Sequence, residues 1–585
     1  MERRVLGLTV EDITRRIAPY LKGHVIVAFL LFLALPAFRV QSIPAFSITR
    51  FLVHCVVFAA CLCSLARMVR RGGEKTLRLS IMDMLVAGFY VLYLTAGALS
   101  ENRELSFSEV SGEFFMMALY VFFRVILAGP SRSDFIEKTS MFAALAAVSL
   151  SLWGLAQYFF EIDVPHGLKL LFKTHHFPVV ASMGNPNFLA EFIVLSLPPA
   201  FHFLLSRKSP VPLVVASVVA GLAVFLTYSR LGWFAMAFAL LLLLASGSKV
   251  ERRRLVVAMT VIAVITGLFF VYHYRTGSTR SDRVLKSFEM STATPLFERT
   301  VIYRAGLSML GDAGFSGMGP GMFGYRYLEY QGRELHSGSG KPIRSLPVDL
   351  DHAHNDLIEI GVDLGYGALA FFILLIGFGV VNGARSLVHS PEGRSPGNLA
   401  LVPLIYLPFC LWSFAFYLPF SKLILLLSLA FIASGSRHAD VGVLRPRVVA
   451  PLLSLLLVAF MAAETRYALS VRHYEKGLAY FKADFEKSFG HFRRGVELYP
   501  YNGYNYFSMG ALFLNHGRRE GVGFLKESNR YFSNSSTYLY IARGLRDHGS
   551  LEESMRWYRY LLFVRPDIRR AHEEYREILD RAGKR

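Results

Sequence analysis

Long apolar segments alternate with short polar ones over the first 465 residues of the chain. Thirteen segments are apolar over roughly 15 to 25 residues. At about 1.5 Å of rise per residue, a helix of this length crosses, or nearly crosses, a bilayer core about 30 Å thick. We predict membrane spans at residues 24–40, 51–69, 81–99, 113–129, 141–160, 187–205, 211–228, 231–246, 255–272, 357–381, 399–417, 420–434 and 448–464.

Two apolar stretches, 211–246 and 401–434, are each too long for a single span. We predict that the first reverses around Ser229-Arg230-Leu231-Gly232 and the second around Tyr417-Leu418-Pro419. The expected fold is all-α: a polytopic bundle of 12 or 13 transmembrane helices, followed by a soluble helical domain.

The soluble part, residues 467–585, has a helical and repetitive pattern. The segment that begins at Tyr506 aligns with the one that begins at Tyr538, a period of 32 residues. In each copy an aromatic residue is followed by a small residue and by a glycine turn at Gly517 or Gly549. This pattern resembles tetratricopeptide repeats and predicts a packed helical array whose concave face binds a protein partner. The expected domains are thus a 1–23 segment, a 24–466 membrane domain and the 467–585 repeats.

Composition agrees with a membrane protein. Of the 585 residues, 53% are hydrophobic and 18% charged, and the mean hydropathy is +0.40. The net charge of +20 comes from short basic clusters between apolar runs, which is typical of membrane topology and argues against nucleic-acid binding. The polar first 23 residues precede no cleavage signal, so we expect the first span to be retained. All cysteines lie inside apolar runs and are expected in the core: Cys55, Cys61, Cys63 and Cys410.

The distribution of Lys and Arg predicts the orientation of the spans. With a cytoplasmic N-terminus, the basic clusters fall on the cytoplasmic side at every step. The opposite face then carries the 161–186 loop, the Arg230 turn and a long polar loop, 273–356. A thirteenth span puts the repeats on this external face as well.

The closing run of the long loop, which begins at Asp351, is the main candidate site. It places His352 and His354 where the chain enters an apolar helix. On a helix the two histidines would point about 200° apart, so we expect one to face a given pocket. Interfacial histidines, capping carboxylates and a His-x-His metal site are the alternatives. No cysteine or third histidine lies at ligand spacing, which disfavours metal.

Other polar elements have a structural and a functional interpretation. Arg230 either extends toward the membrane interface or serves a site. Arg299 and Arg304 are five residues apart on an amphipathic helix, so we expect one to face inward and the other solvent. The run that begins at Gly317 predicts a turn-rich loop, and Gly184-Asn-Pro-Asn predicts a capped turn.

Taken together, these elements resemble the O-antigen ligase and polymerase superfamily of membrane glycosyltransferases over roughly residues 24–434. The matching elements occur in the family's order: Asn185-Pro-Asn, Ser229-Arg-Leu-Gly-Trp, Arg299…Tyr303, Gly317-Met-Gly-Pro-Gly-Met-Phe and His354-Asn-Asp-Leu-Ile-Glu-Ile…Leu364-Gly. The chain differs from the usual pattern at Tyr303, where the family commonly has Trp, and by carrying the repeats.

The resemblance implies a GT-C-like fold in the bacterial inner membrane and metal-independent transfer of a glycan from a polyprenyl (undecaprenyl) diphosphate carrier on the periplasmic face. Lipid A–core, a growing glycan or a protein hydroxyl is the implied acceptor, in lipopolysaccharide or other polysaccharide biosynthesis. No cofactor is implied.

The resemblance also carries residue roles. Arg230 and Arg299 would stabilise the leaving diphosphate, with Arg304 a third candidate, because guanidinium groups stay charged and bind phosphate oxygens in pairs. His354 would be the general base, since its ordinary pKa lies near neutrality. Neighbouring and substrate-binding roles would fall to His352, Asn355, Asp356, Asn185, Asn187, Gly319 and Gly321.

Two other classes of function remain open at this point. A secondary transporter would explain many spans, but such proteins usually show paired interrupted helices in two similar halves, and the sequence has no such symmetry. A non-enzymatic scaffold built on the repeats would tolerate loss of Arg230 and His354.

Overall fold

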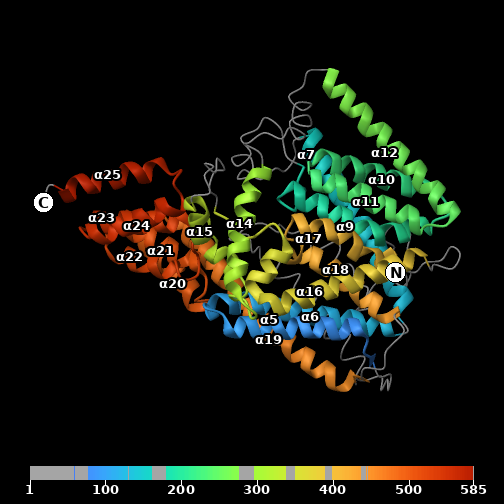
Figure 1. Ribbon diagram of the computed structural model, residues 1–585, viewed down its shortest axis with the longest axis horizontal. Coiled ribbons are helices and arrows are strands. Elements are labelled where there is room, and N and C mark those ends of the chain that lie inside the picture. The colour runs from blue at the N-terminus through green and yellow to red at the C-terminus, as the bar shows by residue number, and fades with distance from the viewer. Residues whose placement is uncertain are drawn as a thin grey trace, which may run out of the picture.

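The computed structural model describes residues 58, 77–129, 131–160, 179–275, 295–337, 349–388, 398–435, 443–444 and 446–583. These residues are almost entirely helical, as the sequence predicts (Figure 1). The expected 1–23 segment and the span at 24–40 lie outside the described residues, and so does all of 51–69 except residue 58.

Each of the other eleven expected spans is a helix, because an apolar segment without water satisfies its backbone groups internally. The helices of the membrane bundle are α5 (Ile81–Leu99), α6 (Arg103–Ala128), α7 (Arg132–Phe160), α9 (Pro186–Leu205), α10 (Val211–Leu226), α11 (Arg230–Ser246), α12 (Lys249–Arg275), α16 (Asp356–Val388), α17 (Val402–Trp412), α18 (Pro419–Gly435) and α19 (Pro446–Tyr480). Seven of them are long and apolar enough to cross a membrane, and the other four are shorter apolar helices.

Both predicted reversals are confirmed. α10 ends at Leu226 and α11 begins at Arg230. Between α17 and α18 the chain makes a short 3-10 turn, η4 (Ala415–Tyr417), while another 3-10 turn, η3 (Asn398–Leu401), leads into α17. α9 is the most enclosed of the long spans and α12 the least; α12 lies at the edge of the bundle in Figure 1.

Contacts join loops that the charge pattern assigns to one side. The short strands β1 (Leu77–Arg78) and β2 (Val443–Leu444) pair antiparallel, which brings the start of α5 next to the start of α19. The guanidinium of Arg254 donates hydrogen bonds to the backbone carbonyls of Arg207 and Lys208, at 2.9 and 3.1 Å. Loops expected on the same side are therefore neighbours in the fold.

The repeat region forms three helix pairs beyond the bundle. α20 (Phe485–Leu498) packs against the end of α19; α21 (Gly503–Asn515) pairs with α22 (Glu520–Ser528), and α23 (Ser535–Asp547) with α24 (Leu551–Val564). The bounds of α21 and α23 are offset by 32 residues, the period seen in the sequence. Identification of these pairs as tetratricopeptide repeats remains a prediction.

The last span and the first repeat helix are one continuous helix. α19 has 35 residues, about 52 Å at 1.5 Å per residue, which exceeds a bilayer core of about 30 Å. The expected domain boundary at residue 467 therefore falls inside α19. The repeats are attached to the membrane bundle through a helix rather than through a loop.

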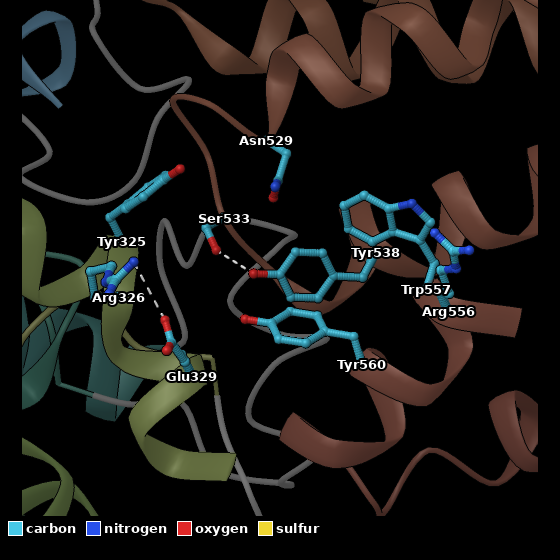
Figure 2. A pocket seen from close by; sticks show the side chains of 9 residues that line it. All are labelled: Tyr325, Arg326, Glu329, Asn529, Ser533, Tyr538, Arg556, Trp557 and Tyr560. Carbon is cyan, nitrogen blue, oxygen red and sulfur yellow. Dashed lines mark hydrogen bonds and ion pairs between the residues drawn. The ribbon is translucent and has the colours of Figure 1, made fainter. Parts of the chain in front are cut away.

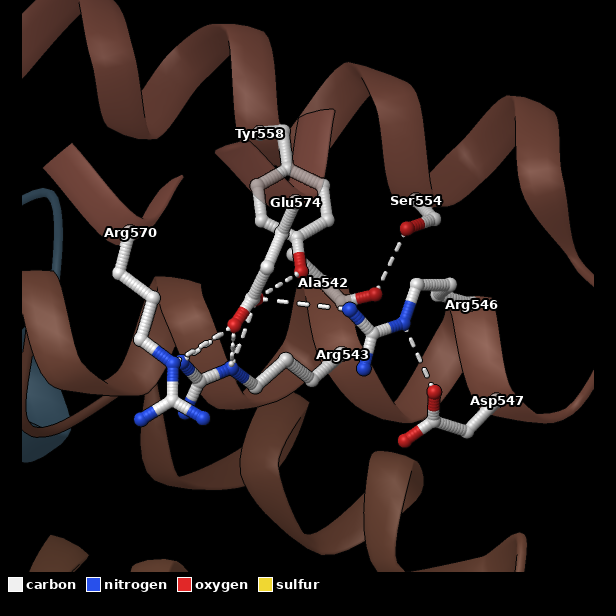
Figure 3. A network of polar contacts seen from close by, with 8 residues as sticks. All are labelled: Ala542, Arg543, Arg546, Asp547, Ser554, Tyr558, Arg570 and Glu574. Carbon is white, nitrogen blue, oxygen red and sulfur yellow. Dashed lines mark hydrogen bonds and ion pairs between the residues drawn. The ribbon is translucent and has the colours of Figure 1, made fainter. Parts of the chain in front are cut away.

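The final helix, α25 (Arg569–Gly583), is fixed by an ion-pair network (Figure 3). The Glu574 carboxylate, with a side chain 10% exposed, accepts hydrogen bonds from Arg543 at 2.7 Å, Tyr558 at 2.6 Å and Arg570 at 2.9 Å. Burial alone would raise the pKa of Glu574, but Arg543, Tyr558 and Arg546 lower it to about 2. These bonds compensate the buried charge and join α25 to α23 and α24.

Two further helices, α14 (Pro295–Ala313) and α15 (Met322–His336), lie between the bundle and the repeats (Figure 1). Gln331 of α15, fully buried, donates a 3.0 Å hydrogen bond to the carbonyl of Val564 in α24. On the bundle side, Glu104 at the start of α6 accepts a 2.7 Å hydrogen bond from Tyr531. The long loop, the end of α5 and the repeats therefore share one side of the molecule.

Candidate functional site

The glycine-rich loop is built to fit an interruption in α16. Gly365 has φ of 82° and divides this helix in two. Gly317 lies against the gap so closely that a Cβ on it would sit 2.3 Å from the carbonyl oxygen of Asp363. The amide of Gly319 donates a 2.8 Å hydrogen bond to that same carbonyl. Two positions with positive φ and no room for a side chain thus explain why glycine recurs in both elements.

The Asp363 side chain fixes the beginning of α15. It accepts hydrogen bonds from the amide of Gly321 at 3.1 Å and from the amide of Phe323 at 2.8 Å. The amides of Gly319 and Gly321, which the family resemblance assigns to substrate, are therefore both bonded to Asp363. In this structure the two glycines shape the loop and direct α15 toward the repeats.

Three non-glycine residues in the described chain have positive φ: Ala181 at 45°, Tyr228 at 55° and His354 at 54°. Each precedes or lies within one of the motif elements, namely Asn185-Pro-Asn, Ser229-Arg230 and His354-Asn355. Such backbone strain persists when the surrounding structure enforces it, and it is concentrated at functional sites. All three lie within or shortly before the motif elements.

Buried hydrogen bonds hold the first two turns. Gln157 of α7, fully buried, accepts from the amide of Ala181 at 2.8 Å and donates to its carbonyl at 3.3 Å. At the second turn, the Ser229 hydroxyl caps α11 by accepting from the amide of Gly232 at 3.1 Å. The indole of Trp233 donates to the carbonyls that end α10.

The third turn is held by Asn355 and Asp356. The Asn355 side chain caps α16 and donates a 3.0 Å hydrogen bond to the carbonyl of Leu411 in α17. Asp356 is fully buried and accepts from the Tyr406 hydroxyl at 2.7 Å and from the amide of Phe416 at 3.1 Å. Both residues fix the backbone beside His354, and neither has a hydrogen bond to its ring.

One face of α14 meets His354. The Tyr303 hydroxyl donates a 3.1 Å hydrogen bond to the His354 carbonyl, and Arg299, one helical turn earlier, is half-buried. In the described chain no hydrogen-bond partner occupies the ring nitrogens of His354. Burial, with the positive charges of Arg299 and His352, lowers the pKa of His354 to about 4. This ring is neutral at physiological pH.

His352 has the opposite electrostatic environment. Its Nδ1 lies 2.7 Å from a carboxylate oxygen of Glu359, which is 1% exposed and also accepts from the amide of Ala353. Burial by itself would lower the pKa of His352, but the charge and hydrogen bond of Glu359 outweigh it and raise the pKa to about 9. The two histidines therefore carry different charges at neutral pH.

Phe414 connects the histidines with the Asn-Pro-Asn element. Its ring stacks on His352 with centroids 4.3 Å apart, and it meets His354 edge-on at 5.1 Å. On its other side it contacts Phe188, three residues after Asn185, at 5.3 Å. Asn185 caps α9 by accepting from the amide of Asn187, whose side chain is exposed.

The candidate arginines are not equivalent. Arg304 is exposed while Arg299 is half-buried, as the helical spacing predicts. Arg230 is exposed at the beginning of α11, where Gly232 packs so closely on α9 that a Cβ would lie 2.6 Å from the Cβ of Ala190. Arg299 is thus close enough to His354 to lower its pKa, and Arg230 begins a helix that packs on α9.

An ion pair lies inside the bundle near these histidines. Lys422 of α18 contacts Glu113 of α6, and both are buried. The Lys422 ammonium also lies 4.1 Å from the ring centre of Phe416, next to the amide that binds Asp356. Charged residues inside spans are costly and are usually paired or functional. The sequence shows one charged residue in each of these two apolar segments. It does not show that the two residues contact each other.

Within the described ranges, no group of three or more His, Cys, Asp and Glu side chains is arranged to hold a metal ion. Sequence reasoning also missed Glu359 and Phe414. Glu359 is a carboxylate within an apolar helix, which was a usable signal, whereas nothing in the sequence distinguishes Phe414 from its neighbouring aromatic residues.

Residues 215–373 match a protein-family model described as O-antigen ligase. The match runs from α10 to α16 and includes Arg230, Arg299 and both histidines, but it covers 159 of the 585 residues. It supports a role in glycan transfer in O-antigen or polysaccharide biosynthesis, in a multi-pass membrane protein. A comparison with curated proteins found no match.

Proposed function

We propose that this protein transfers a glycan from a polyprenyl diphosphate carrier to an acceptor hydroxyl, as an O-antigen ligase-type enzyme on the periplasmic face of the bacterial inner membrane. One observation carries the proposal: a neutral His354 without a ring partner lies beside Arg299, at the mouth of a membrane helix. A general base next to a cation is what this transfer requires.

The reaction separates into three events. The acceptor hydroxyl gives its proton to His354 as its oxygen forms a bond to the anomeric carbon of the donor sugar. The bond from that carbon to the diphosphate breaks, and the diphosphate leaves with the electron pair. Arg299 stabilises the developing negative charge, with Arg230 as the second cation, because guanidinium groups bind phosphate oxygens in pairs.

The electrostatic environment of His354 makes its ring a stronger base when the donor is bound. In the free protein the charge of Arg299 contributes to its low pKa. A diphosphate that binds Arg299 cancels that charge, so the pKa of His354 rises toward its ordinary range and the ring becomes a better base. His352, kept protonated by Glu359, is not available as a base and adds positive charge near the leaving group.

The strained turns would prepare the site before the substrate arrives. His354 is held in the left-handed region by Tyr303, Asn355 and the cap of α16. Holding reacting groups in their working geometry lowers the barrier because no reorganisation remains to be done during the reaction. The acceptor assigned by the proposal is lipid A–core; a growing glycan or a protein hydroxyl is distinguished by the experiment below.

The test is complementation of a strain that lacks this chain, with lipid-linked glycan and surface polysaccharide compared on one gel. With His354→Ala we expect long glycan chains to accumulate on the carrier lipid while mature surface polysaccharide is lost. Accumulation of single repeat units would instead indicate a polymerase, and loss of glycan from a protein would indicate an oligosaccharyltransferase.

A pair of arginine variants provides the matched control. Arg299→Gln should lower transfer to a small residual rate, whereas Arg304→Gln, on the exposed side of the same helix, should retain it. Wild-type transfer by His354→Ala would refute the catalytic assignment, provided that membrane levels of the protein are equal.

A further inference from the structure

We propose that a pocket between α15 and the repeats binds sugar residues of the glycan chain, at a distance from the point of transfer (Figure 2). This inference rests on the proposed function. It assigns the repeats a direct role in holding carbohydrate, in addition to any protein partner.

The pocket has a volume of about 400 Å³ and is lined from both parts of the molecule. α15 contributes Tyr325, Arg326 and Glu329. The other wall comes from α23, α24 and the segment after α22. The size suits one or two sugar rings, which is within the range of small-ligand sites.

Aromatic rings form much of its wall. Tyr538 contacts Trp557 with centroids 5.8 Å apart and meets Tyr560 nearly perpendicular at 5.1 Å. Tyr325 faces them from α15 (Figure 2). A sugar presents an apolar C–H face that packs on such rings, while the hydroxyl of tyrosine and the N–H of tryptophan bond to its edge.

Two polar atoms of the wall lack hydrogen-bond partners. Nε of Arg326 lies 3.9 Å from Glu101, too far for a hydrogen bond, and Oδ1 of Asn529 is also unpaired. Both atoms are buried, so a ligand in the pocket would instead meet the exposed parts of Arg326 and Arg556.

The wall of the pocket carries charges of both signs. Arg326 lies 3.5 Å from Glu329 and 3.9 Å from Glu101, so nearby carboxylates compensate its charge. Arg556 adds a positive charge to the wall and Glu329 a negative one, so the pocket offers both donors and acceptors, which match neighbouring sugar hydroxyls.

The pocket is connected to the candidate site through α15. This helix begins at Met322, directly after the Gly321 amide that Asp363 binds. Arg326 is four residues farther along, about 6 Å at 1.5 Å per residue. A glycan that extends along α15 from the Asp363 end of the helix would reach the pocket.

The test measures binding rather than transfer. The full-length protein in detergent is titrated with surface polysaccharide of the same strain, released by mild acid and size-fractionated, and dextran serves as the control polymer. Wild type should bind the strain's polysaccharide saturably. Trp557→Ala and Arg556→Gln should weaken binding at least tenfold. Arg559→Gln, an exposed arginine of α24 that does not line the pocket, should bind as wild type does.

The outcomes separate this proposal from the function on which it rests. Arg556 is exposed, so its variant tests the pocket even if Trp557→Ala does not fold. Equal binding by Arg556→Gln and Arg559→Gln, or no saturable binding by wild type, would overturn the proposal, as would a protein that occupies the pocket in place of polysaccharide. His354→Ala should bind normally. If that variant still transferred glycan, the catalytic assignment would fail while the pocket assignment stood.

Discussion

The Tyr303 hydroxyl donates a 3.1 Å hydrogen bond to the backbone carbonyl of His354. This contact joins α14 to the strained turn before α16 across 51 positions of sequence. It holds the histidine in a left-handed conformation at φ of 54°, and it aligns the face of α14 that also carries Arg299.

Removal of this hydroxyl should weaken transfer without unfolding the protein. A net hydrogen bond is worth about 1 kcal/mol, so Tyr303→Phe should lower kcat/KM about fivefold if the contact acts in the transition state. Tyr303→Trp keeps a ring N–H donor and should lose less. Transfer assays on membranes with equal protein levels measure both. Unchanged kcat/KM in Tyr303→Phe would show that the contact does not position His354.

The pH profile of kcat/KM should report His354. Its pKa of about 4 in the free protein predicts full activity above that pH and loss below it, when the ring becomes protonated. Arg299→Gln removes a neighbouring positive charge, which raises the pKa and moves the acid limb to higher pH. Arg299→Lys retains the charge and should leave the limb in place. The pH at which activity falls does not depend on how slow the Arg299→Gln variant is. If that pH did not change in Arg299→Gln, the assignment of His354 as the base would be contradicted.

Gly317 should tolerate no side chain. It has φ of 77°, and a Cβ would lie 2.3 Å from the Asp363 carbonyl oxygen. Gly317→Ala must move α15 away from α16, at an expected cost of at least about 2 kcal/mol. Gly311→Ala, in α14 with nothing near its Cβ, is the matched control and should be neutral or slightly stabilising. Thermal aggregation in detergent compares them. Equal midpoints for both variants and wild type would contradict the proposed fit.

The buried ion pair gives a stability prediction with an internal control. Lys422→Met leaves Glu113 unpaired inside the bundle, which should cost about 3–5 kcal/mol. Adding Glu113→Leu removes the stranded charge and should restore most of the stability. The thermal midpoint in detergent is the measurement. A double variant no more stable than the single one would mean that packing, rather than charge, dominates at this position.

Much of the fold could be predicted from sequence because it depends on local composition. Eleven expected spans fall in the described chain and all are helices. The reversals before Arg230 and after Tyr417 follow from the length limit that a bilayer places on an apolar segment. The 32-residue offset between α21 and α23 was likewise visible as a repeat.

The sequence alone therefore determined which segments form apolar helices and where the polar motifs lie, since hydrophobic length and spacing are properties of the chain. Tertiary structure decided how the motifs act. Because Glu359 lies against His352, the two histidines have different charges at neutral pH. The glycine-rich loop fills the gap in α16. Phe414 meets both histidines across about 60 positions of sequence. Such contacts depend on the packing of distant segments, which no local pattern records.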